Sequence, residues 1–317
     1  MTEQWTSALS FSTFSPLNPD GSLPEPTDPR EDVAEVARAW QQRSARGSQV
    51  GFSSFDGLRA AGAADPVDAV NRVVELHGLM GSIGEQLALA YAAEQDAQRW
   101  LARPIVGDAN DPLRLRTGQE HHRMAARGLC EASAHFSLAA AHALANTVLR
   151  VLLLDAVAAD VINSSPFGKK GNGFPPGEDQ NKQAWLTFAP PGKFWSETLV
   201  AAAAPAAQMT ALVERLTHLQ ADPRFDALDQ RRGGYYHRHR PQSITHASPR
   251  KGIASSTGDV VSIDLVGAGD HAVNDDAVND EKQLHRVVAD ALTMLTDTMR
   301  EMDPLIADAA RSCHVEW

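Results

Sequence analysis

An arginine and a histidine, Arg232 and His237, lie in the most basic part of the chain with four residues between them. Cleaving RNA without a metal requires a group that takes the 2'-hydroxyl proton, a group that protonates the leaving oxygen and a cation that holds the charged phosphate. Imidazole titrates near neutral pH, and guanidinium is a two-pronged donor to phosphate. These residue types therefore predict phosphate chemistry, with Arg232 stabilising the phosphate charge and His237 carrying the proton.

The surrounding residues 231–251, RRGGYYHRHRPQSITHASPRK, form what we call the basic stretch. It contains five arginines, one lysine, three histidines and no acidic residue, although the whole chain has a formal net charge of -11. Positive charge is thus concentrated in one place on an acidic protein, and we expect Arg238 and Arg240 to help bind a polyanion there. Tyr236 adds an aromatic face on which an unpaired base can stack.

The basic stretch also has a non-catalytic interpretation. Gly233, Gly234 and Pro241 are typical turn residues. An arginine-rich turn can dock an acidic protein partner, or the acidic segment 269–281 of the same chain. The same spacing of Arg and His occurs at Arg72 with His77 and at Arg116 with His121, so position along the chain favours Arg232 and His237.

Acidic residues and histidines at helical spacing suggest a third class, a metal-dependent helical-bundle enzyme. The candidate ligands share one face of a predicted helix and are Glu120, Glu131, His135 and His142. Three residues of the preceding predicted helix could face them, namely Glu75, His77 and Glu85. Bundles that hold two metals commonly use a Glu-x-x-His pair on each of two helices, which this set lacks. We therefore assign no metal and no cofactor from the sequence.

Asp-Pro pairs and apolar periodicity predict the helices. The pair at 28–29 precedes a short amphipathic helix, and the pair at 65–66 opens a long one that ends before Pro104. A capping box from Thr117 to Glu120 predicts the start of a second long helix that continues to about residue 161. A third is expected over about 195–219 with a bend at Pro205, and a last one from about residue 284.

The remaining segments complete the predicted architecture. Residues 1–27 are rich in Ser, Pro, Thr and Asn and are expected to form a flexible tail. Residues 28–317 would form a single helical domain with loop insertions near 163–193 and 231–280, the second containing a short β-hairpin that turns near Thr257. The fold class is mainly α, an up-and-down bundle of about four long helices.

Composition excludes several alternatives. The most apolar stretch, residues 136–154, is interrupted by His142, Asn146 and Arg150, so we expect no membrane span. The N-terminus lacks the pattern of a secretory leader, which predicts a cytoplasmic protein. No Gly-x-Ser-x-Gly elbow is present, and the two cysteines have neither metal-ligand nor nucleophile spacing.

A helical bundle with an Arg, four to six residues and a His near the junction of its third and fourth long helices resembles the HEPN superfamily. The resemblance covers about residues 65–312 as architecture and Arg232 and His237 as motif. It implies a homodimer and a metal-independent endoribonuclease of a defence or toxin-antitoxin system, in which Arg and His meet across the dimer interface and leave a 2',3'-cyclic phosphate. The residue after the Arg, often Asn, Asp or His in that family, is Gly233, so a binding role without catalysis is also consistent with the resemblance.

Overall fold

The structure, a computed structural model, describes residues 30–60, 65–102, 112–165, 186, 194–237 and 275–317. At 112–121, 123, 231–237 and 275–280 it describes the backbone alone. The described residues are mainly helical and contain no strand. The tail at 1–27 and the β-hairpin expected after residue 251 lie outside these ranges.

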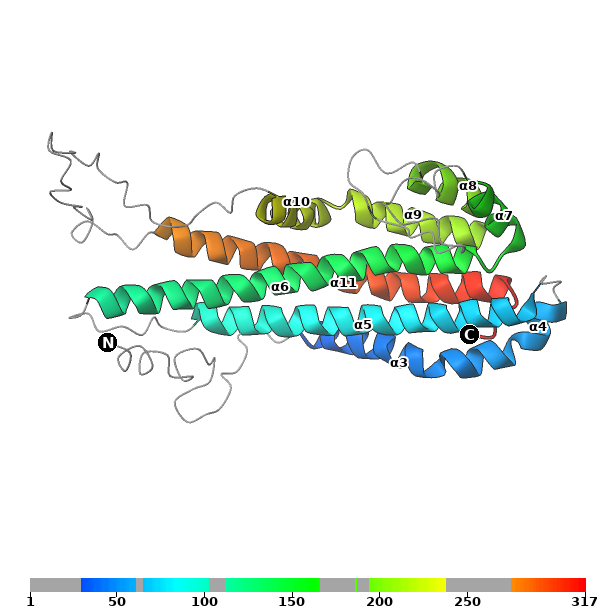
Figure 1. The fold of residues 1–317 in the computed structure, drawn as a ribbon, viewed down its shortest axis with the longest axis horizontal. Helices are drawn as coiled ribbons and strands as arrows, with labels where there is room; N and C mark the ends of the chain where they lie inside the picture. The colour runs from blue at the N-terminus through cyan, green and yellow to red at the C-terminus, as the bar shows by residue number, and fades with distance from the viewer. Residues whose placement is uncertain (1–29, 61–64, 103–111, 166–185, 187–193, 238–274) are drawn as a thin grey trace, which may run out of the picture.

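Three long helices form the centre of the molecule: α5 (Pro66–Ala102), α6 (Pro112–Leu152) and α11 (Asp275–Ser312), which lie side by side in Figure 1. Contacts near both ends show that α5 runs antiparallel to α6. The Ser133 hydroxyl donates to the Ala90 carbonyl oxygen at 2.7 Å, and Arg150 pairs with Glu75 at 3.2 Å. The chain therefore returns along itself between α5 and α6, as expected for helices joined by a short connection.

The short helix predicted after residue 28 is α3 (Glu31–Ser53), followed by α4 (Phe55–Ala60), and α3 packs along α5. Glycines permit a very close approach of these two helices. A Cβ atom on Gly84 would lie 2.6 Å from the Ala37 carbonyl oxygen, and one on Gly81 would lie 2.6 Å from the Ser44 Cβ. Both distances are shorter than real Cβ contacts, so side chains at these positions would force α3 away from α5.

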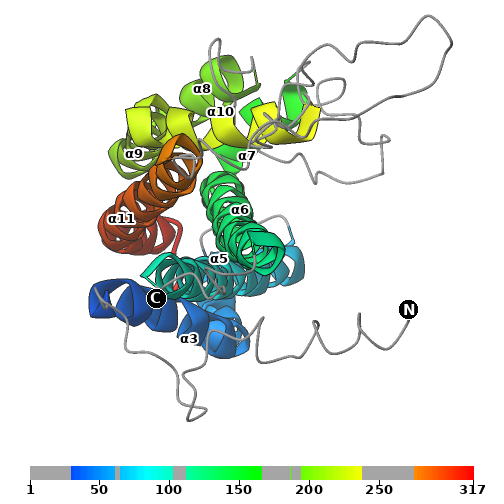
Figure 2. The same cartoon turned by 90° about the vertical axis from the view of Figure 1, so that its left-hand side faces the viewer.

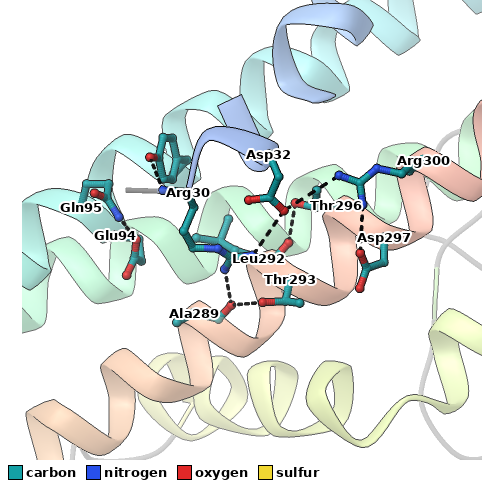
Figure 3. Close-up of polar contacts among 11 residues, drawn as sticks. Arg30, Asp32, Glu94, Gln95, Ala289, Leu292, Thr293, Thr296, Asp297 and Arg300 are labelled. Carbon is teal, nitrogen blue, oxygen red and sulfur yellow. Dashed lines mark hydrogen bonds and ion pairs between the residues drawn. The ribbon is translucent and has the colours of Figure 1, made fainter. Parts of the chain in front are cut away.

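Polar contacts fix the beginning of α3 against α5 and α11 (Figure 3). The Arg30 amide donates to the Tyr91 hydroxyl at 3.0 Å, and the Arg30 guanidinium donates to the Ala289 carbonyl oxygen at 3.0 Å. Asp32 lies 3.9 Å from both Arg30 and Arg300. The start of α3 thus contacts two of the three central helices.

The opposite side of the central helices, seen end-on in Figure 2, is covered by shorter elements. These are α7 (Ala156–Ser164), the π-helix η2 (Phe194–Leu199), α8 (Val200–Ala203), α9 (Ala207–Ala221) and α10 (Pro223–His237). The helix predicted over 195–219 is therefore divided. Ala206 and Asp222 both have extended backbone angles, which separate α8 from α9 and α9 from α10.

The bounds predicted for the second long helix were wrong at both ends. α6 begins at Pro112, so Thr117 and Glu120 lie inside the helix and do not form its cap. The Asp-Pro pair at 111–112 is the better start signal, because proline suits the first helical position. At the other end α6 stops at Leu152, and the Asp155 carboxylate caps the separate helix α7 by accepting from the Ala158 amide at 2.8 Å.

The periodic apolar residues predicted from the sequence form the core. In α5 these are Val70, Val73, Leu76, Met80, Ile83 and Leu87, and in α11 they are Leu284, Val288, Ala291, Leu295, Met299 and Met302. All are buried, as is the predicted α3 face of Val33, Val36, Ala37 and Trp40. Two further predicted positions, Leu79 in α5 and Val287 in α11, are only half-buried. Burial of these stripes, at roughly 25 cal/mol per Å² of apolar surface, is the main force that holds the helices together. None of the described helices is long and apolar enough to cross a membrane.

Candidate functional site

The helix that carries the Arg-His motif, α10, has a well-defined start. Its Asp222 side chain accepts from the Arg224 amide at 2.8 Å and from the Arg224 guanidinium at 2.7 and 3.0 Å. The hydrogen bond from the Arg224 side chain is the main reason that the pKa of Asp222 lies below its usual value. Asp222 and Pro223 form a further Asp-Pro pair, the same signal that opens α5, so the sequence contained the information needed to predict α10.

Two apolar side chains fix the first half of α10 to the bundle. Phe225 and Leu228 are fully buried, and the Phe225 ring lies edge-on to the His142 ring of α6 at 6.4 Å. The His142 Nδ1 atom in turn accepts from the Leu186 amide at 3.2 Å. Since α10 also contacts α9 and α11, its position on the bundle is set by three neighbouring helices.

The second half of α10 carries the predicted site positions. Arg232, Tyr236 and His237 lie on the backbone of this helix, and Gly233 and Gly234 lie within it and not in a turn. Arg238 and Arg240 lie beyond His237, outside the described residues. At about 100° per residue, positions 232 and 236 fall on one side of α10, whereas position 237 is about 140° round the axis from 232.

The competing Arg-His pair at the start of α5 has a structural role. The Arg72 guanidinium donates to the Leu153 carbonyl oxygen at 2.7 Å and pairs with Asp68 at 2.7 Å. The His77 ring is buried and its Nδ1 atom lies 3.1 Å from the Arg43 carbonyl oxygen. Both side chains thus connect helices, while the side chains of Arg116 and His121 fall outside the described part.

Of the residues weighed for a metal, the described side chains of Glu131, His135 and His142 do not gather into one group, and the side chain of Glu120 lies outside the described part. Glu131 pairs with Arg127 at 3.2 Å, and His135 is exposed with its ring 5.9 Å from that of Phe136. His142 contacts Leu186. Among the residues that the structure describes, no three His, Cys, Asp or Glu side chains are placed so that they could hold a metal ion.

A buried polar cluster that the sequence reading missed lies between α5 and α11. Glu94 is 2% exposed, and its Oε1 atom lies 2.6 Å from Nε2 of His285. Its Oε2 atom accepts from the side-chain amide nitrogen Nε2 of Gln95 at 2.8 Å (Figure 3). Glu281 is also buried, one helical turn before His285. Glu281 and His285 are four residues apart and therefore share one face of α11, but this spacing does not indicate Glu94 as a partner.

Comparison of the chain with protein-family models, with curated proteins and with solved structures gave no match.

Proposed function

We propose that this protein is a HEPN-like helical protein of the cytoplasm that binds RNA or a nucleotide at the C-terminal end of α10. The observation that carries the proposal is the placement of Arg232, Tyr236 and His237 on one continuous helix whose first half is fixed by Phe225 and Leu228. A basic and aromatic helix end on an otherwise acidic chain is suited to a polyanion with unpaired bases. Arg238 and Arg240 extend this charge along the chain.

The finer architecture of the resemblance is part of the same proposal. We take α5, α6 and α11 as three members of an up-and-down bundle, with the broken segment from η2 to α10 as the remaining one. In support, α5 and α6 are antiparallel, and α9 and α10 both contact α11. This arrangement gives the Arg-His motif the position, between the third and last members, that the HEPN resemblance requires.

The angular separation of positions 232 and 237 favours a site built from two copies of the chain. Two side chains about 140° apart on one helix are poorly placed to contact a single phosphate. In a homodimer, Arg232 of one copy and His237 of the other would hold the phosphate and carry the proton from the 2'-hydroxyl. The 2'-oxygen then attacks phosphorus, the 5'-oxygen leaves with a proton, and a 2',3'-cyclic phosphate remains.

Cleavage of mixed RNA in the presence of a chelator tests this nuclease function. We expect the wild type to produce 2',3'-cyclic ends, and both Arg232→Ala and His237→Ala to abolish cleavage while their circular dichroism is unchanged. His218→Ala is the matched control, because His218 is an exposed helical histidine on α9, outside the proposed site, and should leave cleavage intact. A mixture of Arg232→Ala and His237→Ala proteins should recover part of the activity, since a shared site contains one intact pair.

The same angular separation supports a second candidate, a non-catalytic interaction protein. In this role the basic end of α10 docks an acidic protein partner, and His237 has no chemical task. Salt-sensitive partner binding that survives His237→Ala but is lost when several arginines are replaced would select this candidate. If the wild type cleaves no RNA under any metal-free condition, the endoribonuclease function of a defence or toxin-antitoxin system is excluded.

A further inference from the structure

A second histidine, His77 of α5, lies in a buried junction of three segments. The His77 ring is 1% exposed, and its centroid lies 4.7 Å from that of Trp317, in the segment that follows α11. The Arg43 guanidinium of α3 lies 5.4 Å from the centre of the same Trp317 ring. Arg43 also donates to both carboxylate oxygens of Asp303 in α11, at 2.6 and 2.7 Å. His77 and Arg43 therefore hold Trp317 against the bundle.

The hydrogen bond made by His77 determines which of its nitrogen atoms carries the proton. Nδ1 lies 3.1 Å from the Arg43 carbonyl oxygen, and a carbonyl oxygen only accepts. The neutral ring therefore has its proton on Nδ1 and a lone pair on Nε2. Nε2 is buried and has no hydrogen-bond partner among the described residues. A second proton would have to be placed on this buried atom with no acceptor to receive it.

The charged groups around His77 make that second proton more costly. On α3, Arg43 and Arg46 both repel a positive imidazole. On α11 the carboxylate of Asp303 is already bound to Arg43, and on α5 itself Glu75 is paired with Arg150. The aromatic face of Trp317 attracts a cation, but this attraction is small beside the cost of burying an unpaired charge.

We propose that His77 is an acid-sensitive latch that holds residues 313–317 against the bundle at neutral pH and releases them when its imidazole is protonated. Release lets the ring reach water, and it separates Trp317 from both His77 and Arg43. Burial is the main reason that the pKa of His77 lies below its ordinary value of 6.5. The folded state therefore binds fewer protons than the released state, so the closed latch is fully stable above about pH 6.5 and weakens as the pH falls below it.

Hydrogen exchange measured by mass spectrometry at about pH 7.5 and pH 5.5 tests the latch. After correction for the intrinsic pH dependence of exchange, we expect a peptide covering 311–317 to exchange on the order of tenfold faster at pH 5.5, because that pH lies about one unit below the ordinary value of 6.5 and each such unit favours the released state about tenfold. A core peptide from 138–149 should stay protected at both pH values. His77→Phe keeps the ring but cannot be protonated, so its 311–317 peptide should exchange equally at both.

A surface variant keeps the test informative if His77→Phe does not fold. Arg46 is exposed, and Arg46→Gln removes one of the charges that oppose protonation in the closed state, so the closed state tolerates the charged ring better and the release midpoint should move to lower pH. Arg38→Gln, an exposed change on the same helix, should leave the midpoint where it is. The latch is refuted if exchange of the wild-type 311–317 peptide does not depend on pH, or if His77→Phe keeps that pH dependence. It is also refuted if the core peptide loses protection together with the 311–317 peptide, or if Arg46→Gln leaves the release midpoint unchanged.

Discussion

Glu94 of α5 and His285 of α11 lie 2.6 Å apart and join two of the central helices across the core. Glu94 is 2% exposed, and the His285 side chain is 16% exposed. A buried carboxylate is tolerated only when partners replace its water, and His285 together with Gln95 provides them. This relationship fixes the register between α5 and α11, because a shift of either helix would leave the buried Glu94 side chain without its His285 partner.

Replacing Glu94 should cost more stability than the lost attraction to His285 alone, because its polar partners stay behind in the core. We expect Glu94→Ala to lower the free energy of unfolding by about 3 kcal/mol, because the polar groups of His285 and Gln95 are left without their acceptor. The double variant Glu94→Leu/His285→Leu should cost clearly less, since both members of the pair are replaced by apolar side chains. Urea unfolding followed by circular dichroism measures both values.

An exposed ion pair provides the control for that comparison. Arg311 and Asp308 are 2.7 Å apart, but their side chains are 56% and 59% exposed. Asp308→Ala should therefore cost no more than about 1 kcal/mol. If Glu94→Ala costs as little as Asp308→Ala, the Glu94–His285 pair is not a structural element of the core.

Replacing two glycines of α5 by alanine should change the stability of the protein in opposite directions. Gly84→Ala places a Cβ atom 2.5 Å from the Gln41 amide nitrogen and 2.6 Å from the Ala37 carbonyl oxygen, and backbone atoms cannot move away cheaply. We expect a loss of about 1–3 kcal/mol of stability. Gly78→Ala meets no atom within 4 Å and should gain up to about 1 kcal/mol from improved helix propensity. Thermal unfolding of the two variants checks the sign, and equal shifts would contradict the close packing of α3 on α5.

Both cysteines should be unreactive in the native protein. Burial, reinforced by the nearby carboxylates of Glu94, Glu281 and Glu131, raises the pKa of Cys130 to about 12. Burial likewise raises the pKa of Cys313 to about 11. Because only the thiolate attacks, and both thiols stay protonated well above pH 8, a thiol reagent at about that pH should label neither residue until denaturant is added. Rapid labelling of Cys130 in the native state would show that the core is open there.

Several elements of the fold could be predicted from the sequence because their signals are local. The periodic stripes in α3, α5 and α11 and the Asp-Pro pair at 65–66 identify helices and their buried faces. The break at Ala206 follows the bend predicted at Pro205, and Asp222 follows the predicted end of that helix at about residue 219, whereas α10 after Asp222 was not predicted. The capping box at Thr117 gave a wrong start for α6, because a local motif does not show whether the helix has already begun upstream.

The candidate site was likewise predicted only in part. Residue types and charge indicated Arg232 and His237, and the structure places both positions on α10. Their angular relation about the helix axis depends on where α10 begins and ends, which the sequence reading did not identify. The Glu94–His285 pair depends on the register between helices that are far apart in the chain, and no local pattern contains that information.

RNA binding by the basic end of α10 is the central claim, and fluorescence polarisation with a labelled single-stranded RNA tests it most directly. Titrations at about 50 and 200 mM salt give both the affinity and its salt dependence. The account predicts that the triple variant Arg232→Ala/Arg238→Ala/Arg240→Ala binds at least about tenfold more weakly and that its salt slope falls by about 2, or about 0.7 per lost phosphate contact. The control variant Arg38→Ala/Arg59→Ala, which removes two exposed arginines from α3 and α4, should bind as the wild type does. Equal affinity of the triple variant and the wild type, or no binding by the wild type, would contradict the claim.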